Sequence, residues 1–188
     1  SSQMISYELA MGIVIITIVL MSGSLSVATI VEQQHGFWAD GYFTWNVFKQ
    51  PLAFIIFLVT SLAECNRAPF DMAECENELI GGYHTEYSSM KLGFFLFADY
   101  LNLFISAAII AALFFGGYNF PGMDNFSGIT LSILGTLVFF AKTVFFIFVF
   151  MWFRWTIPRF RYDQLMHFAW KKLIPLAMIN LVITAVVI

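Results

Sequence analysis

The sequence has few charged residues for its length. Of its 188 residues only 11% are charged, while 60% are hydrophobic. A soluble domain carries about 25% charged residues. A soluble core of this size could not cover so much apolar surface, so a lipid bilayer is the expected solvent. The formal net charge of −3 is too small to indicate nucleic-acid binding.

Several common chemical signatures are also missing. The chain has two cysteines, Cys65 and Cys75, whose spacing matches neither a metal site nor a C-x-x-C motif. Its three histidines, His35, His84 and His167, are far apart in the sequence, so no metal site is predicted. The sequence contains no Ser–His–Asp, phosphate-loop or dinucleotide fingerprint. We therefore expect no redox centre or bound cofactor in this chain.

What the sequence does contain is long apolar runs. Five of them predict an all-α, polytopic bundle of five membrane-spanning helices, at about 9–31, 47–63, 93–115, 129–153 and 173–188. A spanning helix needs about 20 apolar residues, within a range of about 17–25. The second run is unbroken only over 51–63, so its length leaves open whether it spans. The fifth ends with the chain, and the chain begins without Met or a signal peptide. We therefore expect a single membrane domain over 1–188 that is an internal piece of a longer protein.

Basic residues predict the orientation of these helices. Five of them gather between the fourth and fifth runs: Arg154, Arg159, Arg161, Lys171 and Lys172. Loops rich in Lys and Arg stay on the cytoplasmic side, or on the matrix side in a mitochondrion. This rule places the loop at 64–92 on the same side, whether or not the second run spans.

The loop at 64–92 is acidic. It holds six of the twelve acidic residues: Glu64, Asp71, Glu74, Glu76, Glu78 and Glu86. If 70–79 is helical, three of these share one face. A like charge within about 4–6 Å raises the pKa of a carboxyl group, so a crowded set can hold protons near neutral pH and titrate as a unit. The alternative is a solvated acidic loop, since runs of charge usually face water.

Other ionisable residues lie within or beside the apolar runs. Glu8 begins the first, Glu64 ends the second, Asp99 lies in the third, and Lys142 is near the middle of the fourth. An ionisable residue at membrane depth is costly and marks a functional candidate. These four residues suggest an intramembrane proton path. The alternatives are an interfacial position for Glu8 and Glu64, and a structural ion pair for Asp99 and Lys142.

Four segments carry specific motifs. The loop contains R-A-P-F-D, E-C-E-N-E-L and G-Y-H-T-E-Y-S, and the other segments are S-Q-M-I-S-Y-E-L at 2–9, F-A-D-Y-L-N at 97–102 and W-T-I-P-R-F-R-Y-D-Q-L-M-H-F-A-W at 155–170. Together they resemble the quinone-channel membrane subunit of respiratory complex I, a family that bacteria and mitochondria share. The resemblance covers essentially the whole chain. It implies that the second run spans.

The resemblance also implies roles for individual residues. It places six in the quinone channel or its coupling loop: Arg67, Asp71, Glu74, Glu76, Glu78 and Glu86. It puts Glu8, Glu64 and Asp99 in a carboxylate path into the membrane, and Arg154, Arg159 and Arg161 on the cytoplasmic face. Many members have Glu where this chain has Asp99, so the charge is kept on a shorter side chain.

The function implied is that of a membrane subunit of a proton-translocating NADH:quinone oxidoreductase. Quinone would be the substrate, whereas flavin and iron–sulfur clusters would be held by partner subunits of the complex. The H-T-E-Y-S form favours a bacterial inner membrane over a mitochondrial one. Three other functions are open: the related subunit of an energy-converting hydrogenase or formate hydrogenlyase, an independent secondary transporter, and a passive anchor. A transporter would favour inverted repeats, which the sequence does not display.

Overall fold

The computed structural model describes residues 2–35, 44–65, 89–158 and 161–188. These residues form helices and connecting segments, with no strand among them. The elements are α1 (Ser2–Ser22), α2 (Val27–Glu32), α3 (Asn46–Lys49), α4 (Pro51–Glu64), α5 (Met90–Phe114), the 3₁₀ turn η2 (Met123–Asn125), α6 (Ile129–Thr156), α7 (Tyr162–Phe168), the π-helical η3 (Ala169–Leu173) and α8 (Ile174–Val187). The predicted all-α class is confirmed.

Four helical stretches in the described part are long and apolar enough to cross a membrane. They are Met4–Ser22, Met90–Phe114, Ile129–Thr156 and Asp163–Val187. Helix α4 is apolar but has 14 residues, which is about 21 Å of helix against a hydrocarbon thickness of about 30 Å. The fold is therefore a helical membrane bundle, and a fifth span through α4 stays a prediction.

The first predicted helix, 9–31, is wrong in its extent. The chain is helical from Ser2, and α1 ends at Ser22 because Gly23 takes a positive φ of 65°. Glycine adopts this conformation without the steric cost that a side chain brings. The Ser22 hydroxyl donates to the Ile18 carbonyl at 2.6 Å in the last turn. A separate short helix, α2, begins at Val27 after the break.

The last predicted helix begins earlier than position 173. Helix α7 continues into η3 and then into α8 without a break. Pro175 explains the π-helical segment, because proline has no N–H to donate and its ring clashes with the carbonyl four residues earlier. Widening the backbone by one residue per turn at 169–173 relieves that clash. The long helix can then pass through Pro175 and reach Val187.

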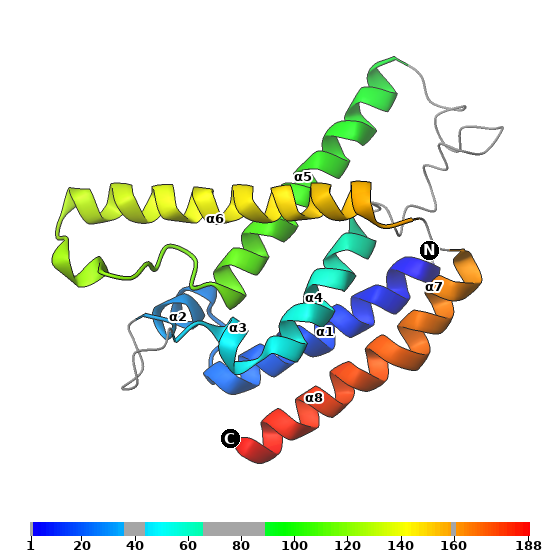
Figure 1. Ribbon diagram of the computed structural model, residues 1–188, viewed down its shortest axis with the longest axis horizontal. Helices are drawn as coiled ribbons and strands as arrows, with labels where there is room; N and C mark the ends of the chain where they lie inside the picture. Colours follow the sequence, from blue (N-terminus) through cyan, green and yellow to red (C-terminus); the bar gives the residue numbers. More distant parts are fainter. Residues whose placement is uncertain (1, 36–43, 66–88, 159–160) are drawn as a thin grey trace.

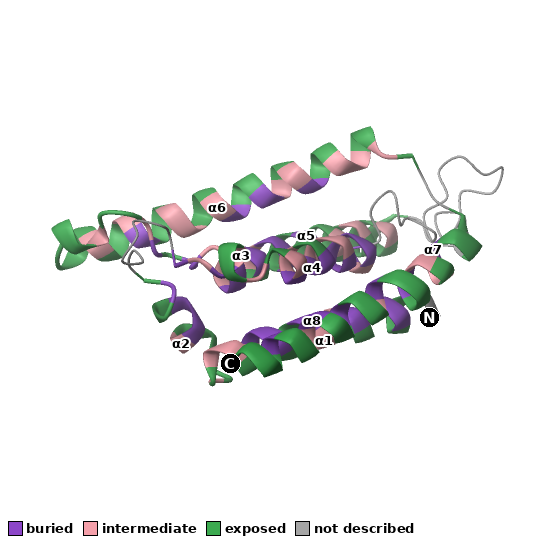
Figure 2. Ribbon diagram, turned by 60° about the horizontal axis from the view of Figure 1, so that its bottom comes forward, coloured by how far each residue is buried: buried purple, intermediate pink, exposed green. Residues whose placement is uncertain are grey.

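The helices lie in three tiers (Figure 2). Helix α6 forms one tier and packs against α5, while α4 lies beside α5 in the middle tier. In the third tier α1 packs between α4 and α8. The α1 core face is Tyr7, Ala10, Val14 and Ile18, spaced three or four residues apart as one side of a helix requires. Alanine in such contacts lets backbones approach closely.

Large apolar side chains cover the outward faces. On α6 these include Phe148, Trp152 and Trp155, of which Trp155 is 83% exposed. Large apolar patches that are exposed mark contact with another protein or with a membrane. Figure 1 shows α6 crossing α5 at a steep angle, with the N-terminus of α1 beside α7.

Candidate functional site

The acidic-loop end is the end of the bundle where α4 stops and α5 begins. Most residues predicted for the loop lie outside the described residues: Arg67, Asp71, Glu74, Glu76, Glu78 and Glu86. Arg159 lies outside them as well. Their predicted roles stay predictions. The structure does describe the two helices between which the loop runs.

The C-terminal end of α4 is joined to α5 by two polar contacts. The side-chain amide of Asn102 donates to the Glu64 carbonyl at 3.4 Å. The Cys65 thiol lies 3.5 Å from the Ser106 hydroxyl, and Cys65 is buried. Asn102 and Ser106 are four residues apart and share one face of α5. This face of α5 therefore meets the start of the loop.

Three of the predicted membrane acids lie on helices that meet at this end. Asp99 is half-buried one turn before Asn102, on the face of α5 that meets α4. Glu64 is half-buried at the last turn of α4, and the Glu8 carboxylate on α1 interacts with it electrostatically. Glu8 itself is exposed. One acid from each of three helices thus lies at the acidic-loop end.

The N-terminal part of α1 is held against α7. The Tyr7 hydroxyl, which is buried, donates to the Leu165 carbonyl at 3.2 Å. The Trp170 indole donates to the Ser6 hydroxyl at 3.0 Å. These contacts fix the turn of α1 that carries Glu8. Sequence reasoning did not single out Ser6 or Tyr7, although both adjoin Glu8 in the S-Y-E motif.

Lys142 lies apart from the three acids. Its ammonium group donates to the backbone carbonyls of Phe115, Gly117 and Asn119 at 2.6, 2.9 and 2.6 Å. It also lies 4.7 Å from the centre of the Trp45 ring. Phe115 follows the last turn of α5, which is about 24 Å along that helix from Asp99. The suggested ion pair between Asp99 and Lys142 is therefore not formed.

Two predicted arginines of the cytoplasmic face are described. Arg154 is half-buried in the last turn of α6. It lines a cleft of about 240 Å³ between α5 and α6, together with Tyr100, Leu103, Phe150, Met151 and Trp155. Arg161 is exposed at the start of α7, where its backbone N–H donates to the Gln164 side chain at 3.3 Å. Both residues lie near the acidic-loop end.

A larger cavity, of about 830 Å³, lies between α4, α6 and α7. Its walls are apolar and include Phe54, Leu58 and Phe153, while His167 and Lys172 add polar groups from the α7 side. No three His, Cys, Asp or Glu side chains in the described ranges are close enough to hold a metal ion.

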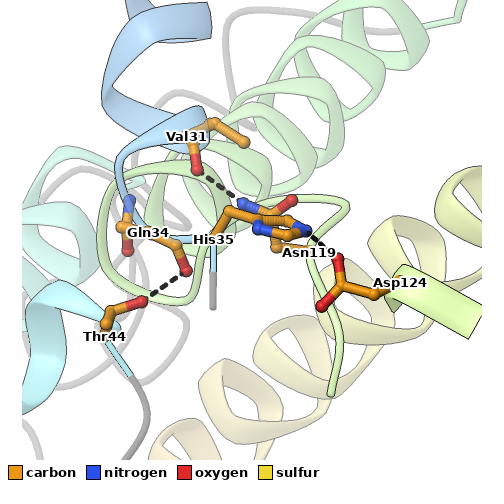
Figure 3. Close-up of polar contacts among 6 residues, drawn as sticks. All are labelled: Val31, Gln34, His35, Thr44, Asn119 and Asp124. Carbon is orange, nitrogen blue, oxygen red and sulfur yellow. Dashed lines mark hydrogen bonds and ion pairs between the residues drawn. The ribbon is translucent and has the colours of Figure 1, made fainter. Parts of the chain in front are cut away.

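A second group of polar contacts lies at the opposite end of α5 (Figure 3). The Thr44 hydroxyl donates to the Gln34 carbonyl at 2.8 Å, and the Asn119 side chain donates to the Val31 carbonyl. His35 and Asp124 form an ion pair with 3.5 Å between the imidazole and carboxylate atoms. Sequence reasoning missed Gln34 and Asn119, because single amides in loops give no pattern.

The fold and these contacts define the class of this protein: a helical membrane bundle in which Glu8 of α1 and Glu64 of α4 interact electrostatically. Within that class, the chain belongs to the NADH dehydrogenase family, whose model matches residues 1–185.

Relatives with known names support the assignment. The chain is 60% identical to the H-type subunit of the NADH-quinone oxidoreductase of Flavobacterium johnsoniae, over 100% of this chain and 53% of the relative. It is 60% identical to an H-type subunit of the Cytophaga hutchinsonii enzyme, over 98% and 53%. It is 48% identical to subunit 8 of the Rhodothermus marinus enzyme, over 98% and 56%. The chain thus spans about half the length of these relatives.

Proposed function

We propose that this chain is the part of a complex I membrane subunit that helps form the quinone channel and couples quinone reduction to proton translocation. The carrying observation is the electrostatic interaction of Glu8 with Glu64 at the acidic-loop end, where α4 also contacts α5 one turn from Asp99. The names of the relatives favour a quinone oxidoreductase over a hydrogenase-type complex. The chain would act within its complex and would hold no redox centre.

The proposed mechanism is electrostatic. Glu8 and Glu64 already influence one another across the α1–α4 contact, so a proton gained by one changes the energy of a proton on the other. Quinone reduction and protonation beside the loop acids Asp71 and Glu76 would change the local charge. Glu64 and then Asp99 would respond by taking up or releasing protons. The acids thereby convert a redox event into proton movement without meeting the quinone themselves.

The clefts near the acidic-loop end suit a quinone, which has an apolar tail and a polar head. Pockets for such ligands combine apolar walls with a few polar groups. The cleft of about 240 Å³ between α5 and α6 has Leu103 and Phe150 in its walls and Arg154 at its edge. In this proposal the cleft holds part of the tail, and the loop residues from Arg67 to Glu86 line the way to the head-group site.

The proposal includes the surroundings of the chain. The bacterial relatives favour the bacterial inner membrane, where ubiquinone or menaquinone is dissolved. Hydrophilic partner subunits would carry the flavin and iron–sulfur clusters. Neighbouring membrane subunits and lipid would cover the exposed apolar faces of α5 and α6.

The test uses the full-length protein in its assembled complex. Glu64→Gln and Asp99→Asn remove one charge each with little change in shape, and Glu32→Gln is the control. Glu32 is exposed on α2, away from the acidic-loop end. We expect both test variants to keep NADH oxidation by ferricyanide, which bypasses quinone. Quinone reduction and the proton gradient should fall together, by about tenfold or more, since about 1.4 kcal/mol of lost stabilisation has that effect.

Wild-type quinone-linked turnover and pumping in both variants would refute the coupling role. A complex that reduces protons to hydrogen instead of reducing quinone would support the hydrogenase-type subunit. Proton transport by the isolated chain in liposomes would support an independent transporter.

A further inference from the structure

The C-terminal end of α5 is closed by side chains from three other segments. The last carbonyls of an α-helix lack partners within the helix, and at membrane depth each needs one. The Gln34 side chain donates to the carbonyls of Ala112 and Leu113 at 3.2 Å each. The Asn46 side chain also donates to the Leu113 carbonyl, at 2.9 Å. Lys142 closes the set from α6, by its contact with Phe115.

The ammonium of Lys142 has as many N–H donors as there are carbonyl acceptors around it. A charged lysine has three N–H donors and no acceptor. Its three acceptors are the carbonyls of Phe115, Gly117 and Asn119, at 2.6–2.9 Å. A neutral amine has two N–H donors, so one of these carbonyls would be left facing a lone pair. Within the described ranges no carboxylate forms an ion pair with Lys142.

The position of the charge is favourable as well. The C-terminal end of a helix carries a partial negative charge, and a cation placed there is stabilising. The Trp45 ring adds a cation–π contact with 4.7 Å between Nζ and the ring centre. The carbonyls belong to the segment after α5, where Gly116 and Gly117 take positive φ values of 71° and 55°. Those glycines let the chain turn so that carbonyls converge on one point.

We propose that Lys142 is a positioning residue, a fixed cation that fastens the C-terminal end of α5 to the middle of α6. Its ammonium holds three carbonyls of the 115–119 segment in place and thereby sets how α5 lies against α6. A fixed role of this kind differs from the proton-carrying role that the sequence suggests for Lys142.

The link to activity rests on the proposed function, because α5 also carries Asp99. A helix of 25 residues transmits a displacement at one end to the other, since its backbone hydrogen bonds keep it nearly rigid. Loss of the Lys142 contacts would let the C-terminal end of α5 move against α6. Asp99 would then shift relative to Glu64, although neither residue touches Lys142.

The experiment compares Lys142→Met and Lys142→Ala in the full-length protein within its complex. Lys91→Ala is the control, because Lys91 is an exposed lysine on the first turn of α5. The measurements are amide hydrogen exchange of peptides covering 111–119, quinone-linked turnover per assembled complex, and the pH profile of that turnover. Lys142→Ala is also measured with n-propylammonium, which replaces the missing atoms, and with tetramethylammonium, which has no N–H.

We expect exchange over 111–119 to become about tenfold faster or more in both variants, because charged hydrogen bonds that close the helix end are lost. Turnover per complex should fall and its pH profile should change. In Lys142→Ala, n-propylammonium should restore both measurements, and tetramethylammonium should restore neither. Lys91→Ala should match the wild type in all of them.

Unchanged exchange over 111–119 with a loss of proton pumping would overturn the proposal and favour proton transfer by Lys142. Wild-type behaviour in every measurement would overturn it too. Failure of the proposed function gives a different pattern: exchange at 111–119 increases in the Lys142 variants, while Asp99→Asn leaves turnover unchanged.

Discussion

The two ends of α5 use polar groups in opposite ways. At the C-terminal end, Gln34, Asn46 and Lys142 each donate to backbone carbonyls that would otherwise be unpaired. At the acidic-loop end, α1 and α4 bring the like-charged Glu8 and Glu64 close enough to interact, and the neighbouring α5 carries Asp99. Stability alone explains the first arrangement. It does not explain the second, which is why the acids carry the functional proposal.

The polar groups at the two ends of α5 are of two kinds. Amides and an ammonium that meet carbonyls are satisfied in a single state, and they hold a structure in place. Carboxylates in a shared region have several protonation states of similar energy, and they can respond to a change in charge. Both kinds can occur along one helix: α5 carries Asp99, and donors from other segments close its C-terminal end far from that residue.

The largest effect is expected from the loop acids. In the intact complex, Glu76→Gln and Asp71→Asn should lower quinone-linked turnover and pumping by about tenfold or more, equivalent to about 1.4 kcal/mol in the barrier. Removing one charge from a coupled set changes the proton affinity of the others. Ferricyanide reduction, measured in the same membranes after quantifying the complex, should persist. Full quinone-linked activity in both variants would indicate that the loop is only a solvated surface. The two ends of α5 would then not differ in function.

An effect of intermediate size, on the free energy of unfolding, is expected at the C-terminal end of α5. Gln34→Leu would leave the Ala112 carbonyl and the Asn46 backbone N–H without their present partner. Each unsatisfied buried group costs about 1–3 kcal/mol, so the free energy of unfolding should fall by about 3 kcal/mol. Thermal unfolding of the full-length protein in detergent measures this change.

Gln33→Leu is the matched control for that prediction. Gln33 is the exposed neighbour of Gln34 and donates to the Ser22 carbonyl. Its replacement should change stability by less than about 1 kcal/mol, because water can take the place of the lost contact. Equal losses of unfolding free energy in Gln34→Leu and Gln33→Leu would show that the burial of Gln34 does not increase its contribution to stability.

The smallest effect is expected from the ion pair between His35 and Asp124. Asp124 has 83% of its side chain exposed and His35 has 40%. Exposed ion pairs contribute about 0–1 kcal/mol, so Asp124→Asn should shift the unfolding transition only slightly. A loss as large as that of Gln34→Leu would mean that this end depends on surface charge rather than on the buried amides.

Much of the architecture could be predicted from the sequence because membrane helices are selected by length and apolarity. Helices lie at Met90–Phe114 and Ile129–Thr156, close to the predicted 93–115 and 129–153. The helix at 9–31 was wrong because hydropathy does not detect a backbone turn at Gly23. The early start of the last helix was missed, since the polar residues of 162–172 hide a helix that is exposed on one side.

The site was predictable in part for a similar reason. Carboxylates inside apolar runs are visible in any sequence, so Glu8, Glu64 and Asp99 could be selected before their contacts were known. The residues that join the surrounding helices, Asn102, Ser106 and Tyr7, could not be selected, because common polar residues on a helix acquire a role only when another helix packs against them.

Composition and run length alone predicted that this chain is a membrane helix bundle, because they indicate which segments are apolar enough to lie in a bilayer. The role of Lys142 depends instead on the packed structure. Which groups an ammonium meets depends on where α5 ends relative to α6, and that position arises from packing between segments far apart in the chain. The same packing brought Glu8 close to Glu64, set α5 against the end of α4, and left Lys142 among carbonyls at the other end of α5.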